Sequence, residues 1–488
     1  MPIFRFFFSR IRETRRVSEF FRKVWAKFAQ YHPLVIVFAL FAMIAGGIGI
    51  AVTPPLQGPD EDIHFVTCRQ IACGDFSRTF PQSLALFQEE HRYLVAHPER
   101  KYSLDKWFKS MAYQSRPEEK LYAIQRITFY AALSYSVPAA GVFISSCFSD
   151  RYLPALYAGR FCCLLAYIIL GCVALHILPF GKTVIFLLLM MPQSIFQAFV
   201  ISYDGITNGA ICLWGALLCR DLFDVGKKEV YFSKGLLLCS ILLCFCKVPY
   251  MFVLSGLLLL FFMKNIQKKG RIWWPLGMMV AFLGFLIPLK YQLEKAPLPE
   301  GVEQFIRIMA PGQGAVDFLQ ERTALVWENI LEIPQLVFGT LTNIDRFMIY
   351  TGSFAGCLGA LDALLPPVLL VFYLLMILIF MQNTDNDLTL QGKFFFLVCG
   401  LMIAGMIFAV FAITYVPVNG MIPGITGRYF IPSAFLLSLA LCGNRLKIKW
   451  LRRYENHTAV AVSAILLTSM LVTLLQRYYF EYWWDRTM

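Results

Sequence analysis

Long apolar stretches recur along the whole chain, each of the kind that crosses the roughly 30 Å hydrocarbon core of a bilayer. Backbone groups in lipid must satisfy their own hydrogen bonds, so runs of this length predict helices. With 58% hydrophobic residues and a mean hydropathy of +0.61, the 488-residue chain is too apolar for a soluble domain. The sequence therefore predicts an all-α polytopic membrane protein with about 11–13 transmembrane helices.

The apolar stretches fall into eleven runs. The longest, Gly235–Met263, is interrupted by Lys247 and Pro249, so it reads either as one helix or as two short ones. In chain order the runs are Pro33–Val52, Ala131–Cys147, Leu156–Leu178, Thr183–Ile201, Ile206–Leu222, Gly235–Met263, Ile272–Leu289, Pro366–Met381, Phe394–Val416, Tyr429–Leu441 and Thr458–Leu475.

The net charge of +13 is concentrated in short segments beside these runs. Eight Lys and Arg residues precede Pro33, four lie in Lys264–Arg271 and five in Arg445–Arg453. Such clusters are typical of cytoplasmic loops, and they argue against a nucleic-acid partner. We therefore expect a multi-pass protein of the cytoplasmic (inner) membrane with a cytoplasmic N-terminus. A twin-arginine export signal at Arg15 and Arg16 is a weaker alternative.

This orientation divides the chain into three parts. In residues 1–32, aromatic residues recur at helical spacing with arginines between them. This pattern predicts a basic amphipathic segment on the inner leaflet. Residues 33–476 form the membrane domain, with outer loops at about 53–130 and 290–365. Residues 477–488 form an aromatic C-terminal tail.

The acidic turn "PPLQGPDEDIHF" directly follows the first apolar run. Its prolines stiffen the exit from the membrane, because proline lacks an amide donor and fixes its backbone angle. Asp60, Glu61, Asp62 and His64 are thereby held close to the bilayer surface. The pattern fits a functional site and fits equally well a solvated helix terminus, where acidic residues are common.

Four further charged residues, Arg160, Asp204, Lys247 and Arg428, lie in or at the edge of apolar runs. Ionisable groups at membrane depth usually face a cavity or one another, which favours a functional role for Lys247 and Arg428, leaves Asp204 open and does not favour one for Arg160. The alternatives are snorkelling for the arginines and a mutual pair for the aspartate and the lysine. The side on which Asp204 lies depends on whether Ala131–Cys147 crosses the membrane completely.

The fourteen cysteines lie mostly within apolar runs, where we interpret them as small apolar residues. Cys68 and Cys73 share the first outer loop, and their spacing leaves open whether they form a disulfide. The sequence contains no Cys/His spacing typical of zinc, no Gly-rich nucleotide loop and no nucleophile elbow.

The stretch "GPDEDIHFVTCRQIACGDF" resembles the signature of a bacterial membrane-protein family known as domain of unknown function 2142. That signature shows Pro-Asp-Glu, then His-Phe, then an Arg and a Gly. Within about Pro54 to Pro432 the resemblance continues through "YSVPAAG", "SYDGITN", "GSFAGCLGALDALLP" and "GRYFIP". The chain departs from the pattern at Ala360, where an aromatic residue is frequent, and at Asp62, where proline or alanine is frequent.

The family in turn resembles the C-type (GT-C) glycosyltransferases, membrane enzymes that take a sugar from a polyprenyl-phosphate carrier on the outer face. The resemblance implies a GT-C-like fold and this reaction class but not the sugar or the acceptor. Because direct displacement inverts the anomeric centre, we expect an inverting transfer to an envelope glycan, lipid or protein. It makes Asp60 or Glu61 the general base, because a carboxylate in reach can take the acceptor proton. If the reaction uses a divalent cation, Asp60, Glu61 and His64 are its candidate ligands. The implied substrate-binding residues are His64, Arg69, Asp204, Lys247, Tyr250, Arg428 and Tyr429.

Two other classes of function stay open. A transporter or lipid flippase also places charges within spans, but internal inverted repeats would support it and we find none in the sequence. A non-catalytic partner in envelope polysaccharide assembly would use the same charges for contacts. For every class, membrane lipids surround the chain, and the sequence names neither the sugar nor the acceptor.

Overall fold

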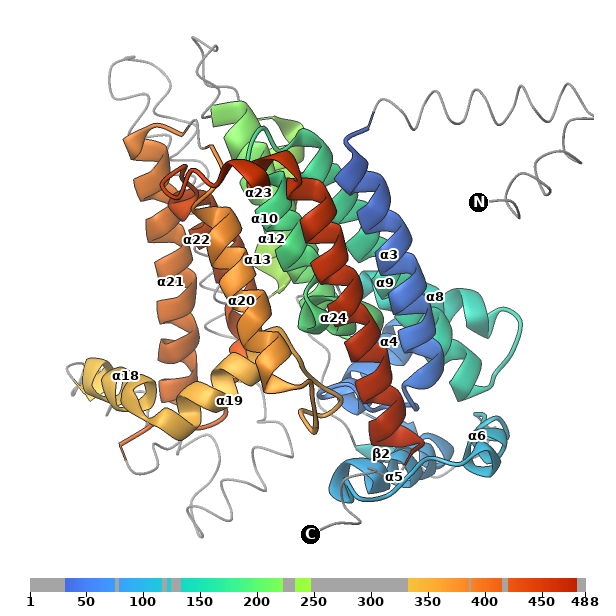
Figure 1. The fold of residues 1–488 in the computed structure, drawn as a ribbon. Coiled ribbons are helices and arrows are strands. Elements are labelled where there is room, and N and C mark those ends of the chain that lie inside the picture. Colours follow the sequence, from blue (N-terminus) through green and yellow to red (C-terminus); the bar gives the residue numbers. More distant parts are fainter. Residues whose placement is uncertain are drawn as a thin grey trace, which may run out of the picture.

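A computed structural model describes residues 31–74, 79–115, 121–123, 133–222, 233–246, 332–385, 388–414 and 420–480 as a bundle of helices (Figure 1). In chain order the elements are α3 (Pro33–Val52), α4 (Glu61–Cys73), β1 (Thr79–Pro81), α5 (Gln82–Ala96), α6 (Leu104–Ser110), β2 (Leu121–Ala123), α8 (Ser136–Ser146), α9 (Tyr152–Ile177), α10 (Lys182–Met190), α11 (Pro192–Phe199), α12 (Asp204–Leu222), α13 (Lys234–Cys246), α18 (Glu332–Thr342), α19 (Ile344–Ala355), β3 (Cys357–Leu358), β4 (Ala363–Leu364), α20 (Pro367–Met381), α21 (Leu390–Thr414), the 3-10 helix η3 (Gly427–Phe430), α22 (Ile431–Leu441), α23 (Lys449–Arg453) and α24 (Glu455–Tyr478).

The structure confirms the predicted all-α polytopic class. Among the described residues, α3, α9, α21 and α24 are long and apolar enough to cross a membrane. α10 and α11 meet the same criterion only when taken together, and they are bent by 59° at the break between them, as in a broken span or a re-entrant loop. The shorter apolar helices are α8, α13, α18, α20 and the unit formed by η3 and α22. Ile272–Leu289 and residues 247–263 lie outside the described residues, so the number of about 11–13 spans stays a prediction.

The apolar run Ala131–Cys147 does not cross the bundle as a span. Its helix, α8, has only 11 residues, about 16 Å at 1.5 Å per residue, which is half the hydrocarbon thickness. α8 instead packs against α4 and α9. Gly141 permits this approach, because a Cβ there would lie 2.4 Å from the Ala158 carbonyl oxygen of α9.

The two sides of the bundle can be told apart, and we call the side that carries the acidic turn, residues 54–62, the acidic side. α9 begins on this side, where the Tyr152 hydroxyl lies 2.6 Å from that of Ser83. At the opposite side, Tyr31 contacts His176 near the end of α9, with ring centroids 5.0 Å apart. The basic helix α23 also lies on that opposite side (Figure 1). The acidic turn and the basic helix α23 thus lie on opposite sides of the bundle, as the predicted orientation requires.

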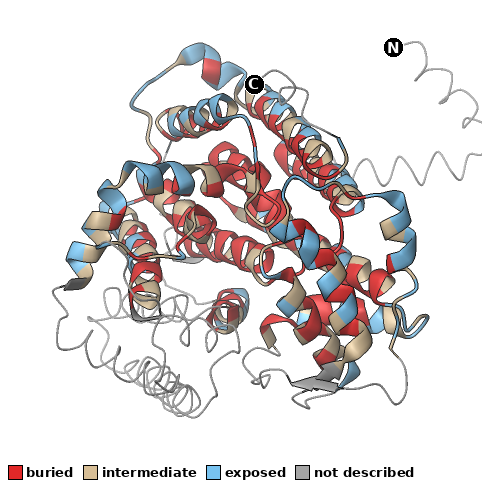
Figure 2. Ribbon diagram, turned by 90° about the horizontal axis from the view of Figure 1, so that it is seen from below, coloured by how far each residue is buried: buried red, intermediate tan, exposed pale blue. Residues whose placement is uncertain are grey.

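Large apolar side chains remain exposed on the outside of the bundle, whereas the buried residues lie between the helices (Figure 2). On α3, Leu40, Ile44 and Ile48 are 56%, 58% and 43% exposed at four-residue spacing. Residues four apart share one face of a helix, so these side chains form a single apolar stripe. An exposed stripe of this kind suits contact with lipid.

Short elements cover the acidic side, and we call α4, α5, α6, β1 and β2 together the cap. The cap has its own core, which includes Phe65 and Phe87 and packs onto the start of α9. His91 of α5 is fully buried within it. Its Nδ1 lies 2.7 Å from the Phe87 carbonyl oxygen and its Nε2 lies 3.1 Å from the Ser110 hydroxyl.

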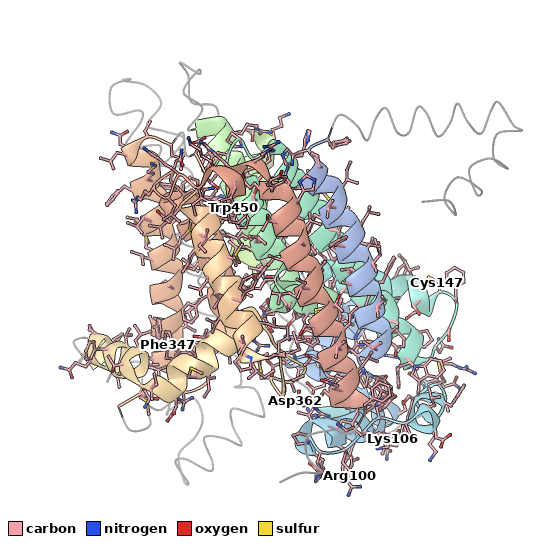
Figure 3. All side chains as sticks on the ribbon, viewed as in Figure 1. Arg100, Lys106, Cys147, Phe347, Asp362 and Trp450 are labelled. Atoms are coloured by element: carbon pink, nitrogen blue, oxygen red, sulfur yellow. The ribbon has the colours of Figure 1, made fainter. Side chains whose placement is uncertain are left out.

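The end of α24 is anchored to the cap and to the β3–β4 segment. Arg477 donates from Nε to the Asp362 carboxylate at 2.6 Å and from Nη2 to the Leu94 carbonyl of α5 at 2.8 Å. The Tyr102 amide donates to the Tyr478 carbonyl at 2.7 Å. Asp362 and Arg100, another residue beside this anchor, are labelled in Figure 3. α24 thus continues two residues past the predicted end of the membrane domain.

The buried His91 predicts a pH dependence of stability. Burial lowers the pKa of His91, so the folded cap keeps this ring neutral at pH values where the unfolded chain binds a proton. The stabilisation is complete above about pH 6.5 and is lost as the pH falls below that value. We expect the melting temperature of the full chain in detergent to fall between about pH 7 and about pH 5.

His91→Gln removes the titrating group, so this variant should show a flatter profile than the wild type. His457→Gln, which changes an exposed histidine on the opposite side, serves as the control and should leave the profile unchanged. Superimposable profiles for His91→Gln and the wild type would contradict the prediction.

Candidate functional site

The acidic turn is strained between two helices. Leu56 and Asp60 both adopt positive φ, 59° and 56°, a conformation that costs a non-glycine residue about 1–2 kcal/mol. Gly58 lies between them, and a Cβ there would approach Val200 Cβ to 2.8 Å. Such strain persists only where neighbouring contacts hold the chain, and it is concentrated at functional sites.

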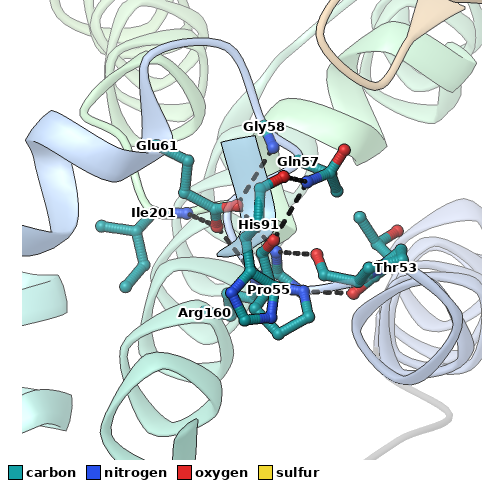
Figure 4. Close-up of polar contacts among 9 residues, drawn as sticks. Thr53, Pro55, Gln57, Gly58, Glu61, His91, Arg160 and Ile201 are labelled. Atoms are coloured by element: carbon teal, nitrogen blue, oxygen red, sulfur yellow. Dashed lines mark hydrogen bonds and ion pairs between the residues drawn. The ribbon is translucent and has the colours of Figure 1, made fainter. Parts of the chain in front are cut away.

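Glu61 supplies the contact that holds the turn. Arg160 of α9 donates to it from Nε at 2.8 Å and from Nη2 at 2.7 Å (Figure 4). The Gly58 amide donates to the same carboxylate at 3.0 Å and the Ile201 amide at 2.9 Å. Both side chains of the ion pair are 0% exposed. Each carboxylate oxygen of Glu61 therefore accepts two hydrogen bonds.

Arg160 also binds the carbonyl groups at the C-terminal end of α3. Its Nη1 donates to the Thr53 carbonyl at 2.7 Å and its Nη2 to the Pro54 carbonyl at 2.9 Å (Figure 4). These carbonyls belong to the helix end, where the last groups lack helical partners. Gln57 then joins the turn to the cap by donating to the His91 carbonyl at 3.0 Å.

This geometry separates the two carboxylates that the sequence offered as general base. Glu61 is enclosed and fully hydrogen-bonded, so taking a proton would break the buried ion pair at high cost. Asp60, the residue before it in the turn, has a side chain that is 64% exposed. The contacts thus favour a positioning role for Glu61 and leave Asp60 as the carboxylate that a substrate can reach.

Arg428 of η3 faces Asp60 from the other half of the bundle. Its Nη2 lies 3.5 Å from the Asp60 carboxylate and 3.0 Å from the Tyr429 hydroxyl, to which it donates. The guanidinium also stands 4.9 Å from the centroid of the Tyr429 ring. The Arg428 side chain is only 6% exposed, and its Nε has no hydrogen-bond partner within the described part of the chain.

A cluster of polar and aromatic side chains completes the site on the acidic side. The Tyr135 hydroxyl lies 2.5 Å from His64 Nδ1, and the ring of Tyr203 lies 5.4 Å from both rings. Asp204 accepts a 3.4 Å hydrogen bond from Gln197. Asp60 and Asp204 both interact electrostatically with Arg428. Asp204 therefore lies on the same side of the bundle as Asp60.

An apolar cavity of about 590 Å³ begins beside Arg428 and runs between α20, α21 and α22. At the site it is lined by Tyr350 of α19 and by Gly427 and Phe430 of η3, and at its far end by Met381 and Leu441. These far residues end α20 and α22 (Figure 1). The cavity thus follows the length of α22 across the bundle.

Five of the predicted site residues are brought together: Asp60, His64, Asp204, Arg428 and Tyr429. Arg69 lies elsewhere, with its guanidinium 4.5 Å from the centroid of the Tyr152 ring. Lys247 and Tyr250 lie outside the described residues. Asp62 accepts a 2.6 Å hydrogen bond from Arg92 and so joins α4 to α5. Cys68 and Cys73 are both free.

The predicted cation ligands do not fit a metal ion as a set. Both oxygens of Glu61 are occupied by protein donors, and His64 Nδ1 contacts Tyr135. Across the described ranges, no three His, Cys, Asp or Glu side chains converge in a way that would hold an ion.

Some residues of the site escaped the sequence analysis as functional candidates. Tyr135 and Tyr203 lie in "YSVPAAG" and "SYDGITN", so the motif blocks contained the signal although the tyrosines were not singled out. Gln197 and Asn208 are joined by a 2.8 Å hydrogen bond; Gln197 lies within an apolar run and belongs to no motif, whereas Asn208 is the last residue of "SYDGITN" and was not singled out. Only their side-by-side placement on α11 and α12 reveals them.

A family model described as a predicted membrane protein (DUF2142) matches residues 43–437. The chain belongs to this family. The match includes the acidic turn, Asp204 and Arg428, whereas Arg477 lies beyond it. Searches among curated proteins and among solved structures gave no match to the chain.

The Glu61–Arg160 pair predicts a sharp difference between neighbouring carboxylates. Glu61→Gln leaves the charge of Arg160 buried without its partner, and we expect a loss of about 3–5 kcal/mol in unfolding free energy. Asp62→Asn is the control, since its partner Arg92 is 61% exposed and exposed pairs contribute about 1 kcal/mol or less. The measurement is thermal unfolding of both variants in detergent. A Glu61→Gln protein as stable as Asp62→Asn would refute the structural role.

Proposed function

We propose that the chain is a membrane glycosyltransferase of GT-C type, which moves a sugar from a polyprenyl-phosphate carrier to an envelope glycan, lipid or protein. In this proposal the acidic side is the outer face of the cytoplasmic membrane, and the N-terminus is cytoplasmic. The observation that carries it is the position of Arg428, which faces the exposed carboxylate of Asp60 and directly follows Gly427, a residue that lines the apolar cavity.

The cavity and Arg428 together suit a lipid phosphate. The cavity is apolar along the length of α22, which fits a hydrocarbon chain lying parallel to the helices. Arg428 is buried beside its mouth with Nε unpaired. A guanidinium binds phosphate through paired donors in one plane, so an oxygen of the phosphate would satisfy this nitrogen. Tyr429 already orients the guanidinium, which donates to its hydroxyl and lies over its ring.

The transfer then uses Asp60 and Arg428 in opposite roles. The Asp60 carboxylate takes the proton from the acceptor hydroxyl as its oxygen forms a bond to the anomeric carbon. The bond from that carbon to the phosphate oxygen breaks, and its electron pair leaves with the polyprenyl phosphate. Arg428 stabilises the growing negative charge on the phosphate. Attack opposite to the leaving group inverts the anomeric centre.

A transporter is the second candidate, because α10 and α11 are bent by 59° at the break between them. Gln193, the second residue after the break at Met191, is fully buried, and neither polar atom of its amide has a partner among the described residues. Broken helices with free polar groups at membrane depth are typical of transport sites. The experiment below separates the two functions, since transport does not require a proton acceptor at Asp60.

Asp60→Asn removes the base and keeps its shape, so we expect glycan transfer to fall by about two to four orders of magnitude. Arg428→Lys keeps the charge but loses the planar donors, and we expect a comparable loss. The measurement is restoration of the missing envelope glycan in a deletion strain, at matched membrane abundance. Asp62→Asn is the control in the same turn and should restore the glycan. Full restoration by Asp60→Asn would reject the catalytic proposal and favour a transporter or an assembly partner.

The cavity is tested by filling it. Ala404→Trp introduces an indole into its lining on α21, so we expect reduced transfer if the lipid chain occupies this space. Ala409→Trp changes a residue of the same helix that does not line the cavity, and it should restore the glycan fully.

A further inference from the structure

A second cavity, of about 950 Å³, lies in the cap between α5 and α6. It is separate from the site around Asp60 and Arg428, since none of those residues lines it. Its volume is at the upper end of the range of about 300–1,000 Å³ that is usual for ligand sites. Lys106, one of its lining residues, is labelled on the cap in Figure 3.

One face of α5 builds the wall of this cavity. Gln82, Leu86, Glu89 and Tyr93 follow one another at helical spacing and all line it. The opposite face, with Leu84, Phe87, His91 and Leu94, is buried in the bundle. Gln88 and Arg92, on that second face, bind Asp62 of α4. α5 therefore presents the cavity on one side and supports the acidic turn on the other.

The lining of the cavity is polar but balanced in charge. Its lining contains two carboxylates, Glu89 and Glu90, two ammonium groups, Lys106 and Lys109, and two amides. An anionic ligand would meet the carboxylates and a cationic one the ammonium groups, so a strongly charged ligand of either sign is disfavoured. Donors and acceptors in equal supply suit a neutral ligand that carries many hydroxyl groups.

Apolar and aromatic surface accompanies these polar groups. Leu86 and Tyr93 are 46% and 40% exposed although they lie on the wall of a cavity. The Tyr113 hydroxyl donates a hydrogen bond to the Glu90 carboxylate. The pKa of Tyr113 is raised to about 12, mainly by burial and secondly by this hydrogen bond. A sugar ring presents hydroxyl groups at its edge and C–H groups on its face. The polar groups of the lining suit the edge of the ring, and the apolar and aromatic side chains suit its face.

We propose that the α5–α6 cavity binds a neutral glycan segment, distinct from the lipid-linked donor. This site rests on the proposed function in one respect only: the bound glycan is the acceptor, or an extension of it, held by the cap while its end reacts at Asp60. The binding itself requires no reaction, so it can be measured without transfer.

The test uses the full chain in detergent and oligosaccharides prepared from the delipidated envelope of the producing cells, separated into neutral and acidic fractions. Saturation-transfer NMR should detect binding of the neutral fraction. Glu89→Gln alters the lining and Ala112→Trp fills the space, and we expect each to weaken binding by about tenfold or more. Glu99→Gln and Ala96→Trp change exposed residues outside the lining and should bind as the wild type does.

Three results would overturn the proposal: preferential binding of the acidic fraction, no binding of either fraction, or wild-type affinity in Ala112→Trp. Variants are compared only at wild-type melting temperature, so a folding defect does not count as a loss of binding. Asp60→Asn distinguishes the two proposals. If this variant keeps full glycan transfer while Ala112→Trp loses binding, the transfer mechanism fails and the glycan site stands. If it loses transfer but no neutral glycan binds, the glycan site fails alone.

Discussion

The buried ion pair between Glu61 and Arg160 is the interaction on which the acidic side depends. Two charges removed from solvent are expensive to bury, and the cost is offset only where every donor and acceptor is satisfied. Here the carboxylate accepts four hydrogen bonds, and the guanidinium also donates to the carbonyls of Thr53 and Pro54. One pair thereby joins the end of α3, the acidic turn, α9 and the start of the segment after α11.

The exposure of Asp60 follows from the burial of Glu61. With Glu61 locked inward, the preceding residue adopts positive φ and its side chain points to the region that Arg428 faces. The pair formed by Arg477 and Asp362 organises the neighbouring part of the same side, where it joins α24 to the cap and to the β3–β4 segment. Tyr478 interacts electrostatically with both pairs. The two buried ion pairs therefore stabilise the part of the acidic side that carries the exposed carboxylate of Asp60.

The site lies where two environments meet. Asp60 is open to the acidic side, whereas the apolar cavity beside Arg428 extends along α22. An enzyme that joins a lipid-linked donor to a polar acceptor needs both, and a charged residue at their boundary can serve the phosphate of the donor. The cap adds a polar cavity on the far side of α5, so the two faces of one helix support different parts of the same surface.

The sequence by itself determined the class of the protein, the spans such as α3, and the candidates Asp60, His64, Asp204, Arg428 and Tyr429. Apolar periodicity and length are local properties, and family motifs are read residue by residue. It did not separate Asp60 from Glu61, because adjacent carboxylates look alike until Arg160, 99 residues away, selects one of them. It also left open whether Ala131–Cys147 crosses the membrane, since composition does not report the length of α8 or the contact of Gly141 with α9. Only the tertiary structure decided these points, because burial and hydrogen bonding depend on residues that are distant in the chain.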